Sequence, residues 1–167
     1  MKVLGIDPGT VIMGYGVIES EGDDPALVAC GALKRPAHTP IGERLDYYYH
    51  ELLSIIARYQ PEAVAIEQPF LAKNPRSALA IGRAQAVAIL AAAGSDLPSY
   101  EYTPTQIKQT VTGYGASSKE QVQEMVKLQL GLAQPPESAD AADALATALC
   151  HLRQMHLENL ISERGNS

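Results

Sequence analysis

Four acidic residues stand where a fold could bring their carboxylates together: Asp7, Glu67, Asp140 and Asp143. Asp7 directly follows the apolar run 3–6, and Glu67 directly follows the apolar run 63–66, so each ends a predicted β-strand. Parallel neighbours in a sheet end at the same edge. If these two strands pair in parallel, the carboxylates of Asp7 and Glu67 lie side by side.

The other two acids are three residues apart in the first turns of the last predicted helix. This spacing places both on one helix face, with Cβ atoms about 5–6 Å apart. Ala144, Ala148 and Leu152 indicate that the same face points inward. Because an acid on an inward face does not act as a cap, Asp140 and Asp143 are candidates for a buried polar site.

Each acid also has an ordinary structural explanation. An Asp before Pro-Gly is a common turn residue, a Glu at a strand end is usually solvated, and an Asp at a helix start is favoured by the helix dipole. As a set they indicate metal chemistry, because clustered carboxylates repel and stay ionised together only beside a cation. Ligands that are all oxygen favour Mg²⁺ or Mn²⁺. Two such ions roughly 3.5–4 Å apart can cleave a phosphodiester, one activating water and one stabilising the leaving oxygen.

The elements that position these acids follow from hydrophobic periodicity and from Pro and Gly punctuation. We expect strands over residues 3–6, 14–18, 26–33, 63–66 and 98–102. We expect helices over residues 41–59, 75–94, 103 or 105 to 111, 117 or 118 to 130, and 138–160. Three successive strands predict an antiparallel meander, and strands that alternate with helices are parallel. The sequence therefore predicts an α/β fold with a mixed five-stranded sheet, its first three strands antiparallel, flanked by helices on both faces.

Length and composition limit the class of protein. The 167 residues predict one domain over residues 1–157, followed by a frayed tail at 158–167. With 46% hydrophobic and 19% charged residues, the chain is typical of globular proteins, and it has no uncharged apolar stretch of the ~18 residues that a membrane span needs. Cys30 and Cys150 form no CxxC motif, which excludes a disulfide scaffold or zinc knuckle and fits a reducing compartment. The histidines lack paired-ligand spacing, so we expect surface positions or satisfied hydrogen bonds for His38, His50, His151 and His156.

The formal net charge of −6 excludes a uniformly basic coat for binding nucleic acid. A local basic face remains possible, because a polyanion needs only the surface it touches to be positive. Between residues 73 and 119 the only acids are Asp96 and Glu101, and they are outnumbered by Lys73, Arg76, Arg83, Lys108 and Lys119. Ordinary surface charge is the alternative interpretation of this segment.

A set of ordered motifs along the chain resembles a known family. The motifs are GIDPGT at 5–10, GYG at 14–16, AIEQ at 65–68, KQTV at 108–111 and DAADALA at 140–146. Each motif alone is weak evidence, but together and in this order they resemble the RuvC Holliday-junction resolvases of bacteria. The resemblance covers about residues 2–156.

The resemblance implies an RNase H-like fold, a homodimer, and Mg²⁺- or Mn²⁺-dependent nicking of two symmetry-related strands of four-way junction DNA. The resemblance further implies a structure-selective endodeoxyribonuclease that serves recombination and repair in the bacterial cytoplasm, and it suggests the RuvA–RuvB branch-migration complex as a partner. The family's acidic tetrad, both catalytic and metal-ligating, falls on Asp7, Glu67, Asp140 and Asp143. Some relatives have His at the position of Asp140. This chain has Asp there, so all the expected ligands are oxygens.

The resemblance also implies DNA contacts. Phe70 matches a position that stacks against a junction base, and Lys108 and Lys119 match basic residues that approach the DNA backbone. Lys73 and Arg76 lie in the basic segment described above, and we add them as expected DNA contacts. The alternatives are that Phe70 folds into the core and that the lysines are simply solvated.

Two further features bear on the resemblance. Several relatives have Arg at the position of Val11, so one positive contact near the active site is missing here. The Ala-rich helix 75–94 has small residues that allow close packing. It could form the dimer interface or simply pack against the sheet, and the sequence does not decide between these two roles.

Three other functional classes share some of these features. The GIDPGT motif also resembles the phosphate-binding hairpin of the actin, hexokinase and sugar-kinase group, but those proteins need a second such domain, for which 167 residues leave no room. A single-domain RNase H-like nuclease acting on RNA is a second alternative. A non-catalytic junction-binding module is a third, although it would not need all four acids.

Overall fold

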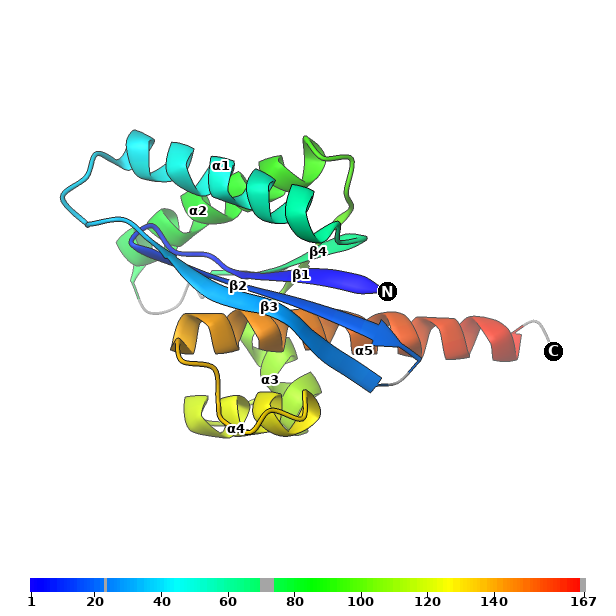
Figure 1. The fold of residues 1–167 in the computed structure, drawn as a ribbon. Coiled ribbons are helices and arrows are strands. Elements are labelled where there is room, and N and C mark those ends of the chain that lie inside the picture. Colours follow the sequence, from blue (N-terminus) through cyan, green and yellow to red (C-terminus); the bar gives the residue numbers. More distant parts are fainter. Residues whose placement is uncertain (23, 70–73, 166–167) are drawn as a thin grey trace.

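The computed structural model describes residues 1–22, 24–69 and 74–165, with side chains up to residue 162. One sheet with helices on both faces forms the body of the molecule (Figure 1). Its five strands lie in the order β3-β2-β1-β4-β5. Their bounds are β1 Lys2–Asp7, β2 Ile12–Glu21, β3 Asp24–Lys34, β4 Ala63–Glu67 and β5 Ser99–Tyr102.

Strand pairing confirms the predicted mixed sheet. β1 pairs with β2, and β2 with β3, in antiparallel register, whereas β1–β4 and β4–β5 are parallel. The hairpin strands β2 and β3 are longer than predicted. They remain paired up to Glu21 and Asp24, so the hairpin turn is tight, and Gly22 in this turn has a φ of 70°. Propensity alone does not show how far cross-strand pairing extends toward such a turn.

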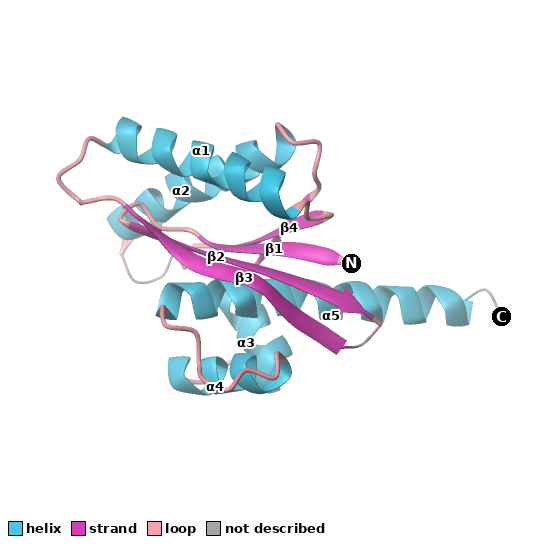
Figure 2. Ribbon diagram, in the orientation of Figure 1, coloured by secondary structure: helices cyan, strands magenta, loops and turns pink. Residues whose placement is uncertain are grey.

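The helices divide between the two faces of the sheet (Figures 1 and 2). α1 (Ile41–Tyr59) and α2 (Pro75–Ala93) cover one face. α5 (Ala139–Gly165) lies on the other face, with α3 (Pro104–Thr112) and α4 (Lys119–Gln129) packed against it. Three of the helix starts follow from their sequences, since side chains cap the first backbone N–H groups. These N-cap residues are Asn74, Thr103 and Ser118.

The alternation of side chains along the central strands separates two hydrophobic cores. Leu4 and Ile6 of β1 and Ile66 of β4 belong to the core beneath α1 and α2, whereas Val3 and Ala65 belong to the core beneath α5. By this alternation, the residues that end β1 and β4 face α5. The strands therefore present Asp7 and Glu67 to the helix that carries the other two acids.

Helix α5 lies very close to β1 and β2 because glycines face it. A Cβ atom added to Gly5 would lie 2.0 Å from the carbonyl oxygen of Ala144, and one added to Gly14 would lie 2.0 Å from that of Asp140. Real Cβ atoms do not approach backbone this closely, so both sites require glycine. These contacts fix the first turns of α5 against the sheet edge at which β1 ends.

The C-terminal segment differs from the expectation. α5 continues to Gly165, so residues 158–165 are helical rather than a frayed tail. Leu157, Leu160 and Ile161 are exposed on these last turns, which extend past the sheet (Figure 1). On these turns the hydroxyl of Ser162 donates to the carbonyl oxygen of Glu158 at 2.9 Å. Among the described residues, no helix is long and apolar enough to span a membrane.

Candidate active site

Asp7 and Glu67 are neighbours at one edge of the sheet. Each is the last residue of its strand, and the residues just before them, Ile6 and Ile66, are partners in the parallel β1–β4 register. Both acids are half-buried. The sequence-based expectation that these strands pair in parallel is therefore confirmed.

α5 brings the other two acids to the same edge. Gly14 pairs with Asp7 across β1–β2, and the backbone of Asp140 lies directly over Gly14. Asp143 follows one turn later, with a side chain that is 22% exposed. Strands from two parts of the chain and a helix from a third thus gather the four predicted acids, which are separated by up to 136 positions in sequence.

The pKa values of the acids show how strongly they act on one another. Burial, reinforced by the negative charges of Glu67, Asp143 and Asp140, raises the pKa of Asp7 from 3.8 to about 8. Burial and the charge of Asp143 raise the pKa of Glu67 from 4.5 to about 7, and a hydrogen bond with Asp7 works against this rise. Asp7 therefore keeps a proton near neutral pH, and this shared proton relieves the repulsion between the two strand-end acids.

Two lysines border the acids. The Nζ atom of Lys119, at the start of α4, lies 2.8 Å from Oδ2 of Asp143, and this hydrogen bond raises the pKa of Lys119. The charge of Lys119 also acts on Asp7 and lowers its pKa, while Lys108 of α3 lowers the pKa of Glu67 and of Asp143. Helices α3 and α4 thus place positive charge beside the acidic cluster.

The donor set fits a hard divalent cation. The four acids offer carboxylate oxygens only, as Mg²⁺ and Mn²⁺ prefer. The raised pKa values of Asp7 and Glu67 reflect burial first and then the negative charges of neighbouring acids, which a cation would offset. In the described part of the chain, no three His, Cys, Asp or Glu side chains already have the spacing of a metal site. Oδ2 of Asp143 is instead engaged by Nζ of Lys119.

Comparison with known proteins identifies the family. The model of the family described as "Crossover junction endodeoxyribonuclease RuvC" matches residues 3–151. The chain belongs to the RuvC family. It is 55% identical over 163 residues to a RuvC from Dehalococcoides mccartyi, covering 98% of each chain.

Solved RuvC structures have the same fold. The chain resembles the Thermus thermophilus RuvC structure with a TM-score of 0.88 at 35% identity, covering 95% of this chain and 97% of that one. It resembles T. thermophilus RuvC in complex with Holliday junction substrate with a TM-score of 0.89 at 34% identity, covering 95% and 96% of the two chains. The RNase H-like α/β architecture expected from the motifs is therefore confirmed.

The expected DNA contacts of this RuvC chain have different outcomes. Lys108 and Lys119 lie beside the acids, as described above. Phe70 and Lys73 lie outside the described residues. Arg76 is exposed in the first turn of α2, and no ion pair joins it to the acids in the part of the chain that is described.

The structure places a basic side chain near Val11 that the sequence did not predict. Val11 is exposed in the turn between β1 and β2, as expected for a position that carries Arg in several RuvC relatives. Arg44 of α1 reaches this turn and donates a hydrogen bond from Nη1 to the carbonyl oxygen of Thr10, at 2.8 Å. The turn that follows Asp7 thus has a basic partner of its own, from a helix that sequence spacing does not link to it.

His151 departs from the expectation of a surface position or satisfied hydrogen bonds. Its side chain is fully buried, and its Nδ1 lies 2.7 Å from the hydroxyl oxygen of Tyr102. Its Nε2 is buried and has no hydrogen-bond partner. No local pattern could reveal this pair, because Tyr102 and His151 are 49 residues apart and meet only through the packing of α5 on the sheet.

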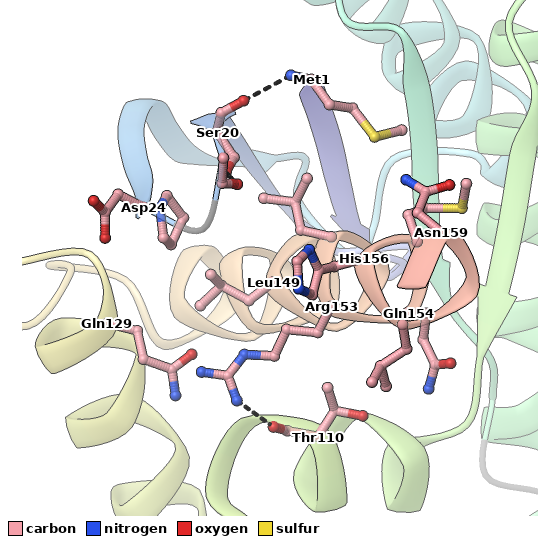
Figure 3. Close-up of a pocket in the computed structure, with 15 residues that line it drawn as sticks. Met1, Ser20, Asp24, Thr110, Gln129, Leu149, Arg153, Gln154, His156 and Asn159 are labelled. Carbon is pink, nitrogen blue, oxygen red and sulfur yellow. Dashed lines mark hydrogen bonds between the residues drawn. The ribbon is translucent and has the colours of Figure 1, made fainter. Parts of the chain in front are cut away.

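A cavity of about 850 Å³ lies away from the acidic cluster, beside the later turns of α5 (Figure 3). Its wall includes Ser20 from β2, Thr110 from α3 and Gln129 from α4, but none of the four acids. The amino group of Met1 donates to the carbonyl oxygen of Ser20 at 2.7 Å, and Arg153 donates to that of Thr110 at 2.9 Å (Figure 3). The candidate active site of this RuvC chain is therefore an open edge of the sheet, separate from this cavity.

Proposed function

We propose that this chain resolves four-way Holliday junctions in recombination and repair by metal-dependent symmetric nicking of two strands. The observation that carries the proposal is the convergence of Asp7, Glu67, Asp140 and Asp143 at one sheet edge of a RuvC-family fold. Four acids from three separate elements are unnecessary for binding DNA, which is itself an anion. Their convergence supports hydrolysis rather than binding alone.

The four acids are the proposed ligands of Mg²⁺ or Mn²⁺, with two ions in each active site. When bound, the metal supplies an activated water and stabilises charge on the phosphate and the leaving oxygen. Asp7 and Glu67 would contribute ligands from two hydrogen-bonded strands. Asp140 and Asp143 would contribute ligands from one face of α5. Asp7 must give up its proton to act as a ligand, so metal binding releases protons.

Lys108 and Lys119 are proposed to bind the DNA backbone beside the acids. Lys119 is half exposed, and its ion pair with Asp143 is the contact that a phosphate and a metal would replace together. Phe70, Lys73 and Arg76 are proposed as further DNA contacts. In sequence, Phe70 and Lys73 lie between Glu67 and α2, and Arg76 lies in the first turn of α2.

A homodimer is proposed to form through the outward face of α2. The inward face of this helix packs into the core, which confirms packing against the sheet and α1 as one role of its small residues. Its outward face is exposed and carries Arg76, Leu79, Arg83, Ala86 and Leu90. Leu79 and Leu90 are 60% and 62% exposed, which is unusual for leucines on a helix that is otherwise well packed. Two copies related by a two-fold axis would place two active sites for cuts in opposite strands.

The cellular setting is proposed from the family resemblance alone. It is the bacterial cytoplasm, with the RuvA–RuvB branch-migration complex as a partner.

The test is digestion of a four-way DNA junction, a DNA duplex and an RNA duplex side by side, with Mg²⁺, with Mn²⁺ and with a chelator. We expect paired symmetric nicks in the junction, dependent on metal, and little cutting of either duplex. Preferential cleavage of RNA would support the RNA-nuclease alternative. Tight junction binding with no cleavage under any metal would support a non-catalytic junction-binding module.

A further inference from the structure

The buried hydrogen bond between Tyr102 and His151 joins the two halves of the acidic site. We propose that this pair is a positioning device that holds α5, and with it Asp140 and Asp143, at the distance from Glu67 that metal binding requires. The inference rests on the proposed function, because it assumes that the four acids form one metal site. It assigns a role to two residues that do not themselves contact the reacting atoms.

On the sheet side, Tyr102 is tied directly to Glu67. The two are partners in the parallel register of β4 and β5. The backbone N–H of Gln68, the residue after Glu67, donates to the carbonyl oxygen of Tyr102 at 2.8 Å. Any movement of Tyr102 relative to α5 is therefore a movement of the strand end that carries Glu67.

On the helix side, His151 and Asp143 belong to the same helix, α5. His151 follows Asp143 by eight residues, about 12 Å along the axis of a continuous helix. Thr147 lies between them, is fully buried, and donates from its hydroxyl to the carbonyl oxygen of Asp143 at 2.9 Å. Because α5 is rigid over this stretch, the position of His151 determines the position of Asp143.

The bond can form with either imidazole tautomer. Nδ1 of His151 lies 2.7 Å from the Tyr102 hydroxyl oxygen, and it accepts when the ring proton is on Nε2 and donates when the proton is on Nδ1. Burial lowers the pKa of His151 to about 4, which keeps the ring neutral and able to accept at working pH. The ring of Tyr100 packs on the imidazole, with ring centroids 4.4 Å apart, and holds its plane.

A core that served only stability would not need this pair. Nε2 of His151 is left without a partner, and a buried unpaired polar group costs free energy that Phe and Leu at these positions would avoid. Unlike an apolar contact, a hydrogen bond between two fixed atoms does not let the helix slide along the strand. Gly5 and Gly14 fix α5 against β1 and β2, and the Tyr102–His151 bond fixes it on the β4–β5 side.

The decisive variant is Tyr102→Phe, which removes the hydroxyl and keeps the ring. Its matched control is Tyr100→Phe, two residues earlier on the same strand, where the hydroxyl makes no described hydrogen bond. We expect Tyr102→Phe to lower kcat for junction nicking roughly 10-fold, the size of effect that a misplacement well under 1 Å can produce. Junction Kd should stay within about 2-fold, because binding rests on other residues. Tyr100→Phe should match the wild type in both.

A second readout does not depend on activity. Mn²⁺ alone should raise the Tm of the wild type, since a ligand that binds only the folded state stabilises it. We expect this rise to shrink in Tyr102→Phe and to be normal in Tyr100→Phe. A Tyr102→Phe variant that has a lower Tm without metal, but the wild-type kcat and the wild-type Mn²⁺ response, would show a purely structural role and overturn the proposal.

Substitutions at His151 test the pair from its other end, and they also serve if Tyr102→Phe does not fold. His151→Asn keeps an acceptor oxygen near the place of Nδ1, whereas His151→Leu removes it. We expect the Mn²⁺-induced rise in Tm to be larger in the Asn variant than in the Leu variant, and equal responses would contradict the inference. If the wild type itself failed to cut junctions, the proposed function would fall, while these Mn²⁺ responses would still decide whether the pair positions a metal site.

Discussion

Asp7 has the strongest electrostatic coupling of the four acids. It ends the central strand β1, and Glu67, Asp143 and Asp140 all act to raise its pKa. A carboxylate that retains its proton until about pH 8 is a poor candidate for a solvated turn residue, which is the ordinary explanation for Asp before Pro-Gly. The charges of the three other acids all act on it, so it would be one of the residues that hold a bound metal.

Asp7→Asn should abolish junction cleavage and leave junction binding intact. The amide keeps the size of the side chain but removes the negative charge, so nicking should fall by more than roughly 10³-fold. Binding should change little, because it rests on lysine and aromatic contacts. Single-turnover nicking and a gel-shift titration with the same junction would measure the two quantities. Loss of both cleavage and binding would mean that Asp7 is needed for folding instead.

The same residue should make the metal-free protein less stable as the pH rises. The pKa of Asp7 is higher in the folded chain than in the unfolded chain, and so is that of Glu67. Such groups contribute full stability below their unfolded pKa, near pH 4, and this contribution is lost as the pH rises to about 7 for Glu67 and about 8 for Asp7. Asp7→Asn in chelator should therefore raise the Tm at pH 8.5 by about 5 °C, which corresponds to about 2 kcal/mol in a domain of this size.

Thermal melts of the two proteins from pH 4 to pH 8.5 would test this dependence. The difference in Tm should shrink toward pH 4, where Asp7 is protonated in the folded chain and begins to be protonated in the unfolded chain as well. Glu43→Gln, which changes an exposed acid in the first turn of α1, provides the control and should show no such trend. A Tm for Asp7→Asn that stays below the wild-type value at high pH would contradict the assignment of repulsion to this cluster.

At the scale of elements, the sequence predicted what is local and missed what depends on packing. Strand ends at Asp7 and Glu67, and helix starts at Asn74, Thr103 and Ser118, follow from apolar runs and capping residues, and the structure contains them all. The parallel direction of β4 was predictable because a helix connects β3 to β4. That β4 pairs with β1 was a condition of the argument from the sequence, and the structure meets it. Together these local features placed two of the acids correctly.

What the sequence could not show is how α5 sits on the sheet. Two glycines in ordinary strand positions, Gly5 and Gly14, determine its approach, and nothing in their neighbours distinguishes them from other strand glycines. The Tyr102–His151 pair and the contact of Arg44 with the turn after Asp7 join elements that are distant in sequence. Side-chain packing between such elements, rather than propensity, sets these contacts.

Gly14→Ala should disrupt the site through this packing. The new methyl group would meet the backbone of Asp140, so α5 must move or the strand must bend, at about 1–3 kcal/mol. The displaced Asp140 should also reduce nicking more than junction binding. Gly42→Ala is the matched control, because its Cβ would meet nothing within 4 Å and helix propensity favours Ala by roughly 0.5–1 kcal/mol.

Chemical denaturation of the two glycine variants, with nicking measured in parallel, would check this expectation. Gly42→Ala should be at least as stable as the wild type and equally active. If Gly14→Ala were as stable and as active as Gly42→Ala, the close approach of α5 to β2 would not control the position of Asp140.

At the scale of the whole molecule, the two faces of the sheet have different tasks. α5 on one face completes the acidic site, and α1 and α2 on the other face bury a core of their own. The outward side of α2 offers Leu79 and Leu90 to solvent. A net charge of −6 opposes DNA binding in general. A dimer would partly offset this repulsion, because it would present two basic edges to one junction and their contacts would add.

Substituting both exposed leucines of α2 should separate the two copies. We expect the wild type to sediment as a dimer at micromolar concentration, and the double variant Leu79→Glu, Leu90→Glu to sediment as a monomer, because four carboxylates would then face one another in the interface. On a junction, the monomer should leave single nicks in place of paired, symmetric ones. Leu128→Glu, which changes a leucine of α4 that is equally exposed at 61%, should remain a dimer with paired nicks. A wild-type protein that is strictly monomeric on the junction would exclude the paired mechanism, and a dimeric double variant would place the interface elsewhere on the molecule.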